Sequence, residues 1–333
     1  MGAQHDAGAG LAPRTVFIDG EAGTTGLQIR ERLARASDIA VQSIDAAQRK
    51  DTSARKALMA EVDLVVLCLP DDAAREAVAL ADELGDAAPR ILDASTAHRV
   101  APDWAYGFAE LDRDQQSAIA AAKRVANPGC YPTGAIALIR PLIDAGLLPR
   151  DHALTVNAVS GYSGGGRKMI EDYEAGAAPS FELYGLGLEH KHVPELFRYS
   201  GLTRQPIFVP SVGNFRQGML VSIPLHLDML PGKPCLRDLE LALDKHYSDS
   251  ALISVVQEPT ASITRLAAET LNGTVHMELF VFGKSALNQA VLVARLDNLG
   301  KGAAGAAVQN IRLMLGLGGP VQPHPREAAR VTT

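Results

Sequence analysis

Cys130 lies in the stretch of this chain whose residue types point most directly to chemistry, Asn-Pro-Gly-Cys-Tyr-Pro-Thr-Gly at residues 127–134. Pro128 fixes φ and Gly129 permits positive φ, so the residues before the cysteine predict a turn. The apolar run at 135–142 then predicts a helix that begins near the cysteine. The unpaired N–H groups and the dipole of a helix N-terminus favour a thiolate, the nucleophilic form of cysteine. We therefore expect a catalytic nucleophile; the alternative is a small buried side chain.

Two histidines, His190 and His192, stand just before another predicted helix, in Glu-His-Lys-His-Val-Pro-Glu at residues 189–195. Pro194 suits the first turn of a helix, and Glu195 suits its positive end. Because imidazole exchanges protons near neutral pH, either histidine could be the acid/base partner of the cysteine. The alternatives are structural histidines or a metal site. The His-x-His pair has no evident third or fourth ligand, so no metal is expected.

Several cations are placed where they could hold an anionic substrate. Arg99 follows a predicted strand in a hydroxyl-rich turn, and Arg216 stands in a predicted turn further along the chain. Arg167 and Lys168 end the glycine-rich stretch 160–168, which reads as a mobile loop able to close over a phosphorylated substrate. Charged hydrogen bonds of this kind bind phosphate and carboxylate strongly. For each cation, a plain surface charge is the alternative.

Three glycines, Gly20, Gly23 and Gly26, are spaced GxxGxxG between an apolar strand at 15–18 and an amphipathic helix at about 27–36. A glycine triplet in that position predicts a dinucleotide site, because it allows a tight turn and close approach of the backbone to a pyrophosphate. The N-terminus of the helix would supply N–H donors to the anion. A glycine-rich loop with no ligand is the alternative.

The residues that follow the second expected strand, 41–44, predict the preference between NADP and NAD. Arg49 and Lys50 follow it, and a basic pair there suits the 2′-phosphate of NADP. Asp45, at the end of the strand, points the other way, since an acidic residue suits NAD. The residues therefore favour NADP(H), with NAD(H) as the weaker possibility.

The third expected strand, 63–69, is almost entirely apolar, as is typical of a parallel strand buried on both faces. Pro70 follows it in a loop that we expect near the nicotinamide. Asp72 is expected to cap a helix at 73–84. Cys68 lies within the strand and is expected to belong to the core.

The second half of the chain predicts a sheet domain. After the last expected strand, small residues from 303 to about 315 predict a helix that can pack very closely. We expect this helix to return to the first domain. The expected strands of the whole chain, besides those above, are 90–93, 153–159, 207–210, 219–227, 275–282 and 289–296.

Composition limits the class of protein. The chain has 333 residues, enough for about two domains. Its net charge of −6 argues against a sequence-independent nucleic-acid binder and against an anionic membrane surface. No apolar stretch reaches ~18 residues, so no membrane span is expected. Three cysteines without a CxxC motif, and no signal-like start, fit a reducing cytoplasm.

Taken in order, these motifs resemble the shorter subfamily of N-acetyl-γ-glutamyl-phosphate reductases of arginine biosynthesis. The resemblance runs from about Thr15 to Gly316 and is carried above all by NPGCYPTG together with the downstream HKHVPE. The segments FIDGEAGTTG, SGYSGGGRK and DNLGKGAAGAAVQN follow the family order. One departure is Glu21, because longer members carry Ala-Ser-Gly-Tyr-Thr-Gly in the glycine loop and an acid would face the pyrophosphate.

The resemblance implies NADPH-dependent reduction of N-acetyl-L-glutamyl 5-phosphate to the 5-semialdehyde through a thioester on Cys130, with His190 or His192 as acid/base. It implies an α/β fold: a Rossmann domain at 13–129 with 300–316, and a catalytic and oligomerisation domain with a mixed sheet at 130–299. It also implies a cytoplasmic homodimer or homotetramer. Residues 1–12 and 319–333 are expected to be flexible tails.

The resemblance also assigns residues to two ligands. Those expected to bind the cofactor are Gly20, Gly23, Thr24, Thr25, Gly26, Arg49, Pro70, Gly164 and Asn298. Those expected to bind the substrate are Ser95, Arg99, Asn127, Arg167, Lys168, Glu195 and Arg216.

Other functions remain as alternatives. An aspartate-semialdehyde dehydrogenase, or another acyl-phosphate reductase of this architecture, would use the same cysteine and histidine. A non-enzymatic dinucleotide sensor would bind NADP without turnover and would leave the turn before Cys130 unexplained. A DNA-binding regulator is weaker still, because no basic helix-turn-helix is visible.

Overall fold

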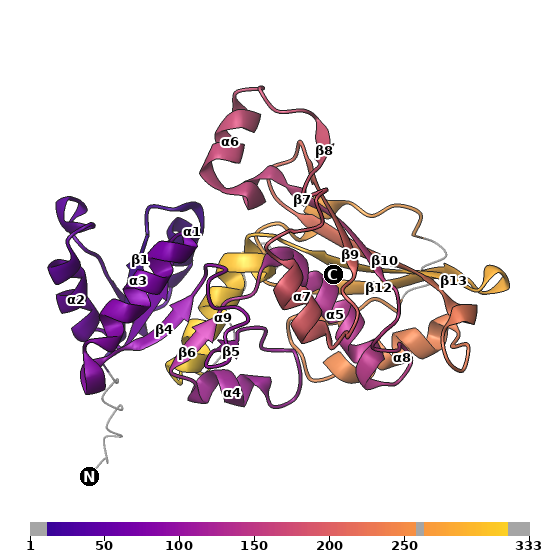
Figure 1. Ribbon diagram of the computed structural model, residues 1–333, viewed down its shortest axis with the longest axis horizontal. Coiled ribbons are helices and arrows are strands. Elements are labelled where there is room, and N and C mark those ends of the chain that lie inside the picture. Colours follow the sequence, from indigo (N-terminus) through magenta and orange to yellow (C-terminus); the bar gives the residue numbers. More distant parts are fainter. Residues whose placement is uncertain (1–11, 258–262, 319–333) are drawn as a thin grey trace, which may run out of the picture.

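The computed structural model describes residues 12–257 and 263–318, so the expected tails lie outside the described part of the chain, apart from Ala12. Two sheets, each with its own helices, stand side by side (Figure 1). The α/β class predicted from the sequence is confirmed. Within the described residues, no helix is both long and apolar enough to span a membrane.

The first sheet has six strands in the order β2-β1-β3-β4-β6-β5, and every pair is parallel. Its strands are β1 (Arg14–Asp19), β2 (Ile39–Gln42), β3 (Leu64–Leu67), β4 (Arg90–Asp93), β5 (Ala105–Tyr106) and β6 (Arg124–Ala126). From β1 the chain moves outward to β2 and then crosses to β3 on the other side. In such sheets, ligands bind at the carboxyl ends of the strands where the direction switches.

Five helices belong to the first sheet: α1 (Thr24–Leu33), α2 (Thr52–Ala60), α3 (Asp71–Asp82), α4 (Gln115–Ala121) and, from the C-terminal end of the chain, α9 (Gly305–Met314). The buried residues Ala307 and Ile311 of α9 share a core with Val16 of β1 and Ile29 of α1. The predicted return of the last helix to the first domain is therefore confirmed.

The second sheet has seven strands in the order β11-β12-β13-β10-β7-β9-β8 and is mixed. Its strands are β7 (Thr155–Gly161), β8 (Phe181–Leu183), β9 (Ile207–Gly213), β10 (Met219–His226), β11 (Ile253–Val255), β12 (Met277–Lys284) and β13 (Gln289–Leu296). Its helices are α5 (Cys130–Asp144), α6 (Gly166–Glu174), α7 (Val193–Ser200) and α8 (Leu236–Tyr247). Helices α5, α7 and α8 lie along one face, whereas α6 stands at the end of the sheet near the first domain (Figure 1).

The start of α3 differs from the prediction. The helix begins at Asp71, and Pro70 is its capping residue, so the expected cap by Asp72 is wrong. Asp72 lies in the first turn and pairs with Arg75 instead. The Asp71 carboxylate accepts hydrogen bonds from the N–H and the hydroxyl of Thr96. Asp71 therefore ties the start of α3 to the turn after β4, the turn that carries Arg99.

The glycine-rich stretch 160–168 is divided among three elements rather than forming one loop. Strand β7 continues to Gly161, a 3₁₀ turn covers Tyr162–Gly165, and α6 begins at Gly166. The N–H of Tyr162 donates to the carbonyl of Phe215, and the Tyr162 ring stacks on Tyr173 at 4.8 Å. These backbone and ring contacts hold the segment in place here, and its closure over a substrate stays a prediction.

Candidate active site

Cys130 is the first residue of α5, as predicted, and follows the turn that leaves β6. Gly129 precedes it in extended conformation, and no side chain caps the helix. The carbonyl of Gly129 accepts hydrogen bonds from the N–H and the hydroxyl of Thr133, which fixes the first turn. The first N–H groups of α5 are therefore available beside the sulfur, where they could stabilise an oxyanion.

Three polar side chains converge beside the cysteine, over Gly129. A methyl group built on Gly129 would lie 2.5 Å from Arg99 Nη1, 2.7 Å from His192 Nε2 and 2.8 Å from Glu195 Oε1. Only glycine leaves room for this cluster. The structure thus brings together Arg99, His192 and Glu195, from the turn after β4, the loop before α7 and α7 itself.

Glu195 is the centre of the cluster and has only 1% of its surface exposed. Its Oε1 accepts a hydrogen bond from Arg99 Nη1 at 2.5 Å. Its Oε2 accepts from the Tyr106 hydroxyl at 2.9 Å and from the N–H of Gly129 at 3.0 Å. Both carboxylate oxygens are therefore used within the protein, so the geometry points to a positioning role rather than the substrate contact expected from the sequence.

The two histidines differ in their surroundings. His192 is buried, and its ring nitrogen Nδ1 has no hydrogen-bond partner within the described residues. The backbone N–H of His192 donates to His190 Nδ1 at 3.1 Å. Burial, then the charge of Arg99, lowers the pKa of His192 well below its usual value. Burial, then Lys191 and Arg99, lowers the pKa of His190 to about 4. Both imidazoles are neutral at pH 7 and could accept a proton.

The resting state of Cys130 differs from the prediction. The N–H groups at the start of α5 favour the thiolate, as expected, and the Arg99 guanidinium, which was expected only as a substrate contact, does so too. Burial outweighs both and raises the pKa of the thiol to about 11. The cysteine is therefore mainly a neutral thiol at pH 7. Cys68 is also a thiol, since burial raises its pKa to about 12, in keeping with the core position predicted for it.

A π-helix, Gly300–Ala304, supports the cysteine from the other side. A methyl group on Gly302 would lie 2.8 Å from Cys130 Cβ, so the backbone of the π-helix touches the nucleophile directly. Asn127 donates to the carbonyl of Ala303 at 3.1 Å and accepts from Asn310 at 3.0 Å. Asn127, expected to bind substrate, is thus committed to joining the turn before Cys130 to this support.

Asn298 is likewise committed to the fold. Its Oδ1 accepts from the N–H of Gly218 at 2.8 Å and its Nδ2 donates to Ser163 Oγ at 3.0 Å. Gly164 lies close by, because a methyl group there would be 3.4 Å from Asn298 Nδ2. Asn298 therefore holds the turn that carries Gly164, and the exposed Gly164 faces outward as a cofactor contact would.

The glycine loop fits a dinucleotide. Gly20 has φ of 90°, and a methyl group on it would lie 2.4 Å from the carbonyl oxygen of Cys68. A methyl group on Gly26 would lie 2.6 Å from the carbonyl oxygen of Gly20. Gly23 caps α1, and within the described residues no side chain forms a capping hydrogen bond at that end of the helix. Thr24 and Thr25 form the first turn, so their N–H groups are free to bind a pyrophosphate.

Glu21 does not face the pyrophosphate, contrary to the expectation. It turns toward the end of β2, where its carboxylate pairs with Arg30 and Arg49. The N-terminus of α1 is consequently left without an opposing acid. Arg49 is held at that edge of the sheet, as its assignment to the cofactor requires.

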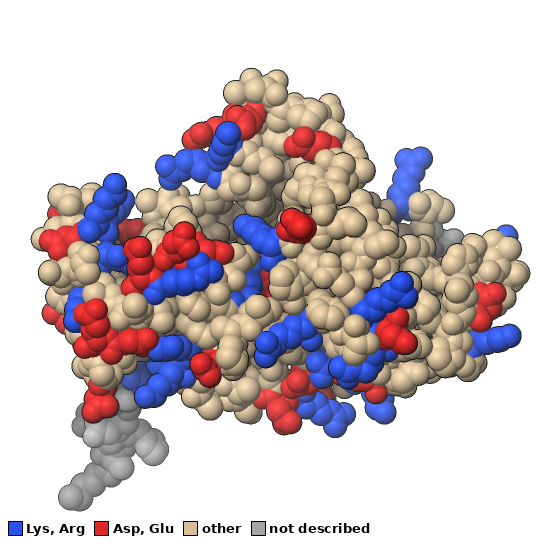
Figure 2. Space-filling view, in the orientation of Figure 1, with Lys and Arg blue, Asp and Glu red and all other residues tan. Residues whose placement is uncertain are grey.

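The remaining cations are not gathered around Cys130. Arg167 donates to the carbonyl of Ala22 in the glycine loop at 2.7 Å, which places it on the cofactor side of the site. Figure 2 shows basic side chains of α6 overhanging the hollow between this helix and the first domain. Lys168 is exposed on the same helix. Arg216 pairs with Glu174 at an exposed position, so its side chain is not brought to the thiol.

Ser95 and Pro70 frame the site from the first sheet. Ser95 Oγ donates to the buried carboxylate of Asp93 at 2.8 Å, and the same carboxylate oxygen lies 2.6 Å from His98 Nδ1. The hydroxyl is thus directed inward and shapes the turn that carries Arg99. Pro70 ends the β3 loop, at the carboxyl edge where a nicotinamide would lie.

Sequence reasoning missed Tyr106, whose hydroxyl holds Glu195 and whose ring stacks on Tyr199 at 3.7 Å. It lies in a strand of only two residues, β5, which leaves no pattern to recognise. Among residues 12–257 and 263–318, no group of three or more histidine, cysteine or acidic side chains is arranged to hold a metal ion.

Comparison with known proteins identifies the family. The model for the semialdehyde dehydrogenase NAD binding domain matches residues 15–119, and the model for the semialdehyde dehydrogenase dimerisation domain matches residues 130–298. N-acetyl-gamma-glutamyl-phosphate reductases from Brucella ovis and Brucella abortus are each 55% identical over 307 residues, covering 90% of this chain and 98% of each relative. The chain belongs to the N-acetyl-γ-glutamyl-phosphate reductase group of the semialdehyde dehydrogenase family.

Solved structures of this family share the fold. Aspartate semialdehyde dehydrogenase from Francisella tularensis superposes with a TM-score of 0.69 at 13% identity, covering 91% of this chain and 100% of that one. The enzyme from Candida albicans, solved with NADP, gives a TM-score of 0.66 at 16% identity, covering 92% and 99%. The predicted semialdehyde-dehydrogenase-like architecture is therefore confirmed.

Proposed function

We propose that the protein reduces N-acetyl-L-glutamyl 5-phosphate to N-acetyl-L-glutamate 5-semialdehyde, with NADPH as the reductant and phosphate as the leaving group, in cytoplasmic arginine biosynthesis. The observation that carries the proposal is the position of Cys130 at the open start of α5, beside Arg99 and a neutral His192. The substrate is inferred from the name of the reductases that are 55% identical to this chain.

The residues divide the chemistry between them. A neutral imidazole, His190 or His192, accepts the proton of Cys130 as the sulfur attacks the acyl carbon. The first N–H groups of α5 hold the oxyanion, and the C–O bond to phosphate breaks to leave a thioester on sulfur. When bound, a nicotinamide cofactor would supply the hydride that reduces this thioester. The imidazolium then returns its proton as the C–S bond breaks and the aldehyde leaves.

Arg99 is the cation nearest to the acyl group in this scheme. One of its nitrogens is held by Glu195, while its Nε is buried without a partner in the described part of the chain. A guanidinium anchored on one side and unsatisfied on another is suited to bind an anionic group of the substrate. Arg167 and Lys168, on α6, are better placed for the dinucleotide phosphates than for the acyl phosphate.

The proposed cofactor preference is NADP(H) over NAD(H). Gly20, Gly23 and Gly26 provide the close approach that a pyrophosphate needs, and the first turn of α1 provides N–H donors. Arg49, at the end of β2, supports binding of the 2′-phosphate. These contacts support the assignment of residues 13–129 with 300–316 to the cofactor and of 130–299 to catalysis.

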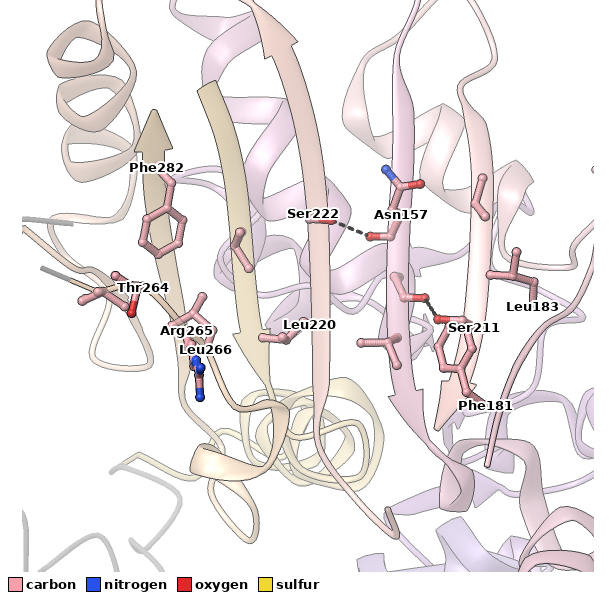
Figure 3. A pocket seen from close by; sticks show the side chains of 15 residues that line it. Asn157, Phe181, Leu183, Ser211, Leu220, Ser222, Thr264, Arg265, Leu266 and Phe282 are labelled. Carbon is pink, nitrogen blue, oxygen red and sulfur yellow. Dashed lines mark hydrogen bonds between the residues drawn. The ribbon is translucent and has the colours of Figure 1, made fainter. Parts of the chain in front are cut away.

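A homodimer, or a pair of homodimers, is proposed through the face of the second sheet opposite α5, α7 and α8. A groove of about 740 Å³ crosses that face, lined by strand residues such as Asn157, Leu220 and Phe282 and by the segment 263–266 (Figure 3). At its edge Phe181 is 57% exposed and Leu183 49%. An apolar face of this kind suits a second copy of the chain, and the family model over residues 130–298 carries the name dimerisation domain.

The reverse reaction tests the function. Purified protein receives N-acetyl-glutamate semialdehyde, phosphate and NADP, and NADPH absorbance is followed, with aspartate semialdehyde as the control substrate. Phosphate-dependent NADPH formation with the acetylated substrate alone is the expected result. Activity with aspartate semialdehyde but not with the acetylated substrate would indicate an aspartate-semialdehyde dehydrogenase instead. Cofactor binding without turnover would favour a dinucleotide sensor.

A further inference from the structure

Glu21 gathers two arginines and a serine where β2 ends. Its carboxylate accepts hydrogen bonds from Arg30 Nη1 at 2.7 Å, Ser43 Oγ at 2.9 Å and Arg49 Nη2 at 3.2 Å. The three donors come from α1, from the residue after β2, and from the end of a 3₁₀ turn, Ala46–Gln48. Separate pieces of the chain therefore converge on one buried acid.

This position has a defined meaning in a dinucleotide fold. The turn between β1 and α1 receives the pyrophosphate, and the end of β2 receives the adenosine ribose. Glu21 belongs to the first and reaches Ser43 in the second. In the usual motif, the acid that binds the ribose 2′-hydroxyl and favours NAD stands about 20 residues beyond the glycines. Glu21 stands within the glycine loop, but its carboxylate reaches the same corner. Taken alone, its negative charge would repel a 2′-phosphate there.

The arginines change the charge of the corner. The side chain of Glu21 is 8% exposed, whereas those of Arg30 and Arg49 are 49% and 44% exposed. The acid thus lies inside and the guanidinium groups lie outside, with a formal charge of +1 for the three side chains. In the described part of the chain, the only hydrogen bonds of either guanidinium go to Glu21. Since each guanidinium has five N–H donors, both keep donors for a phosphate.

We propose that Arg30 and Arg49 mask Glu21 and so convert an NAD-type acidic corner into a site for the 2′-phosphate of NADP(H). The inference rests on the proposed nicotinamide-dependent reaction and names the residues that set its cofactor preference. Loss of the arginines does two things at once: it removes donors to the phosphate and it exposes the acid. Loss of the arginines should therefore weaken the binding of NADPH and leave the binding of NADH almost unchanged.

Binding measurements without any acyl phosphate test this assignment. Kd values for NADPH and NADH come from nicotinamide fluorescence, for the wild type, Arg30→Met, Arg49→Met and the double variant. Each single variant is expected to weaken NADPH by about 10- to 100-fold, the value of one charged hydrogen bond, and NADH by less than about threefold. The double variant is expected to prefer NADH. Arg35→Met, which removes an exposed charge after α1, is the control and should change neither Kd.

A third substitution tests the acid itself. Adding Glu21→Gln to the double arginine variant removes the repulsion and should restore NADPH affinity by about tenfold. Equal losses for both cofactors, or no recovery with Glu21→Gln, would overturn the proposal. Thermal melting checks each variant, and the single variants, which replace half-exposed side chains, carry the test if the double variant does not fold.

The two proposals can fail separately. NADPH selectivity that disappears with the arginines, in a protein that does not reduce the acyl phosphate, would refute the proposed function and leave the cofactor assignment intact. Turnover that uses NADPH and NADH equally well in the wild type would refute the cofactor assignment and leave the reaction intact.

Discussion

Replacing Glu195 by glutamine should weaken the fold and, at the same time, make Cys130 more reactive. The substitution keeps one oxygen for the N–H of Gly129 and the hydroxyl of Tyr106, but it removes the charge that balances Arg99. Two consequences of opposite sign follow, because the same charge stabilises the arginine and disfavours the thiolate.

The loss of stability can be estimated from burial. The Arg99 side chain is 9% exposed and that of Glu195 is 1%, so the variant leaves a guanidinium buried without its counter-ion. Removing one partner of a buried pair costs about 3–5 kcal/mol. At about 2–4 °C per kcal/mol for a domain of this size, Tm should fall by roughly 6–20 °C.

The gain in reactivity follows from the pKa of Cys130, which burial holds at about 11 and to which Glu195 adds. Removing this negative charge should lower the pKa of the thiol, although Glu195 contributes less to that pKa than burial or Arg99 does. Each unit gives about tenfold more thiolate at fixed pH. Alkylation of Cys130 by iodoacetamide, measured by peptide mass spectrometry between pH 7 and 10, should accelerate accordingly.

Glu174→Gln is the matched control, because it makes the same change in an exposed pair with Arg216. Surface pairs of this kind contribute about 0–1 kcal/mol, so neither Tm nor alkylation should move appreciably. A folded Glu195→Gln protein whose Cys130 reacts at the wild-type rate, or more slowly, would refute the electrostatic account of the cluster.

Three further substitutions or conditions have defined outcomes. Cys130→Ser should keep the Kd for NADPH and lose turnover by several orders of magnitude, since a hydroxyl is a far weaker nucleophile; near-normal turnover would exclude the thioester route. Gly302→Ala should lower kcat with little change in cofactor Kd, because its methyl would lie 2.8 Å from Cys130 Cβ, whereas Gly187→Ala, with open space around it, should be silent. Tm should fall as the pH drops below ~6.5, because the two histidines are protonated there in the unfolded chain but stay neutral in the folded protein, where the pKa values of His190 and His192 are lowered. In the His190→Asn/His192→Asn double variant, Tm should depend less steeply on pH if these histidines cause the effect.

The fold could be predicted wherever local chemistry decides it. Gly20 adopts a positive φ against the end of β3, and Cys130 starts a helix, as the residues predict. Gly129 is extended, however, and is needed for space rather than for positive φ. The continuous apolar run of β3 is buried throughout. By contrast, the stretch 160–168 was expected to be one loop. Nothing in a glycine-rich sequence shows that the N–H groups of Tyr162 and Ser163 will be satisfied by the carbonyls of Phe215 and Arg216.

The site was harder to predict because a motif names a residue without giving the direction of its side chain. Glu195 and Asn127 lie in recognisable motifs, yet their polar atoms are used within the fold. Arg167 and Arg216 looked equivalent in the sequence, but the first contacts the glycine loop and the second pairs with Glu174. These directions depend on where the second sheet stands relative to the first, which is decided by contacts far apart in the chain.

The pKa of the Cys130 thiol is a second property that the sequence could not predict in full. The sequence predicted the sign of one contribution correctly, since the helix start does favour the thiolate, but it did not place Arg99 beside the sulfur. Burial is a property of the assembled site, and it outweighs both. With a thiol pKa of about 11 beside neutral imidazoles, attack on the substrate requires proton transfer from sulfur as the bond forms, rather than a standing thiolate–imidazolium pair. A protonated thiol is also less reactive toward oxidants than a thiolate, so the resting site protects its nucleophile until a substrate binds.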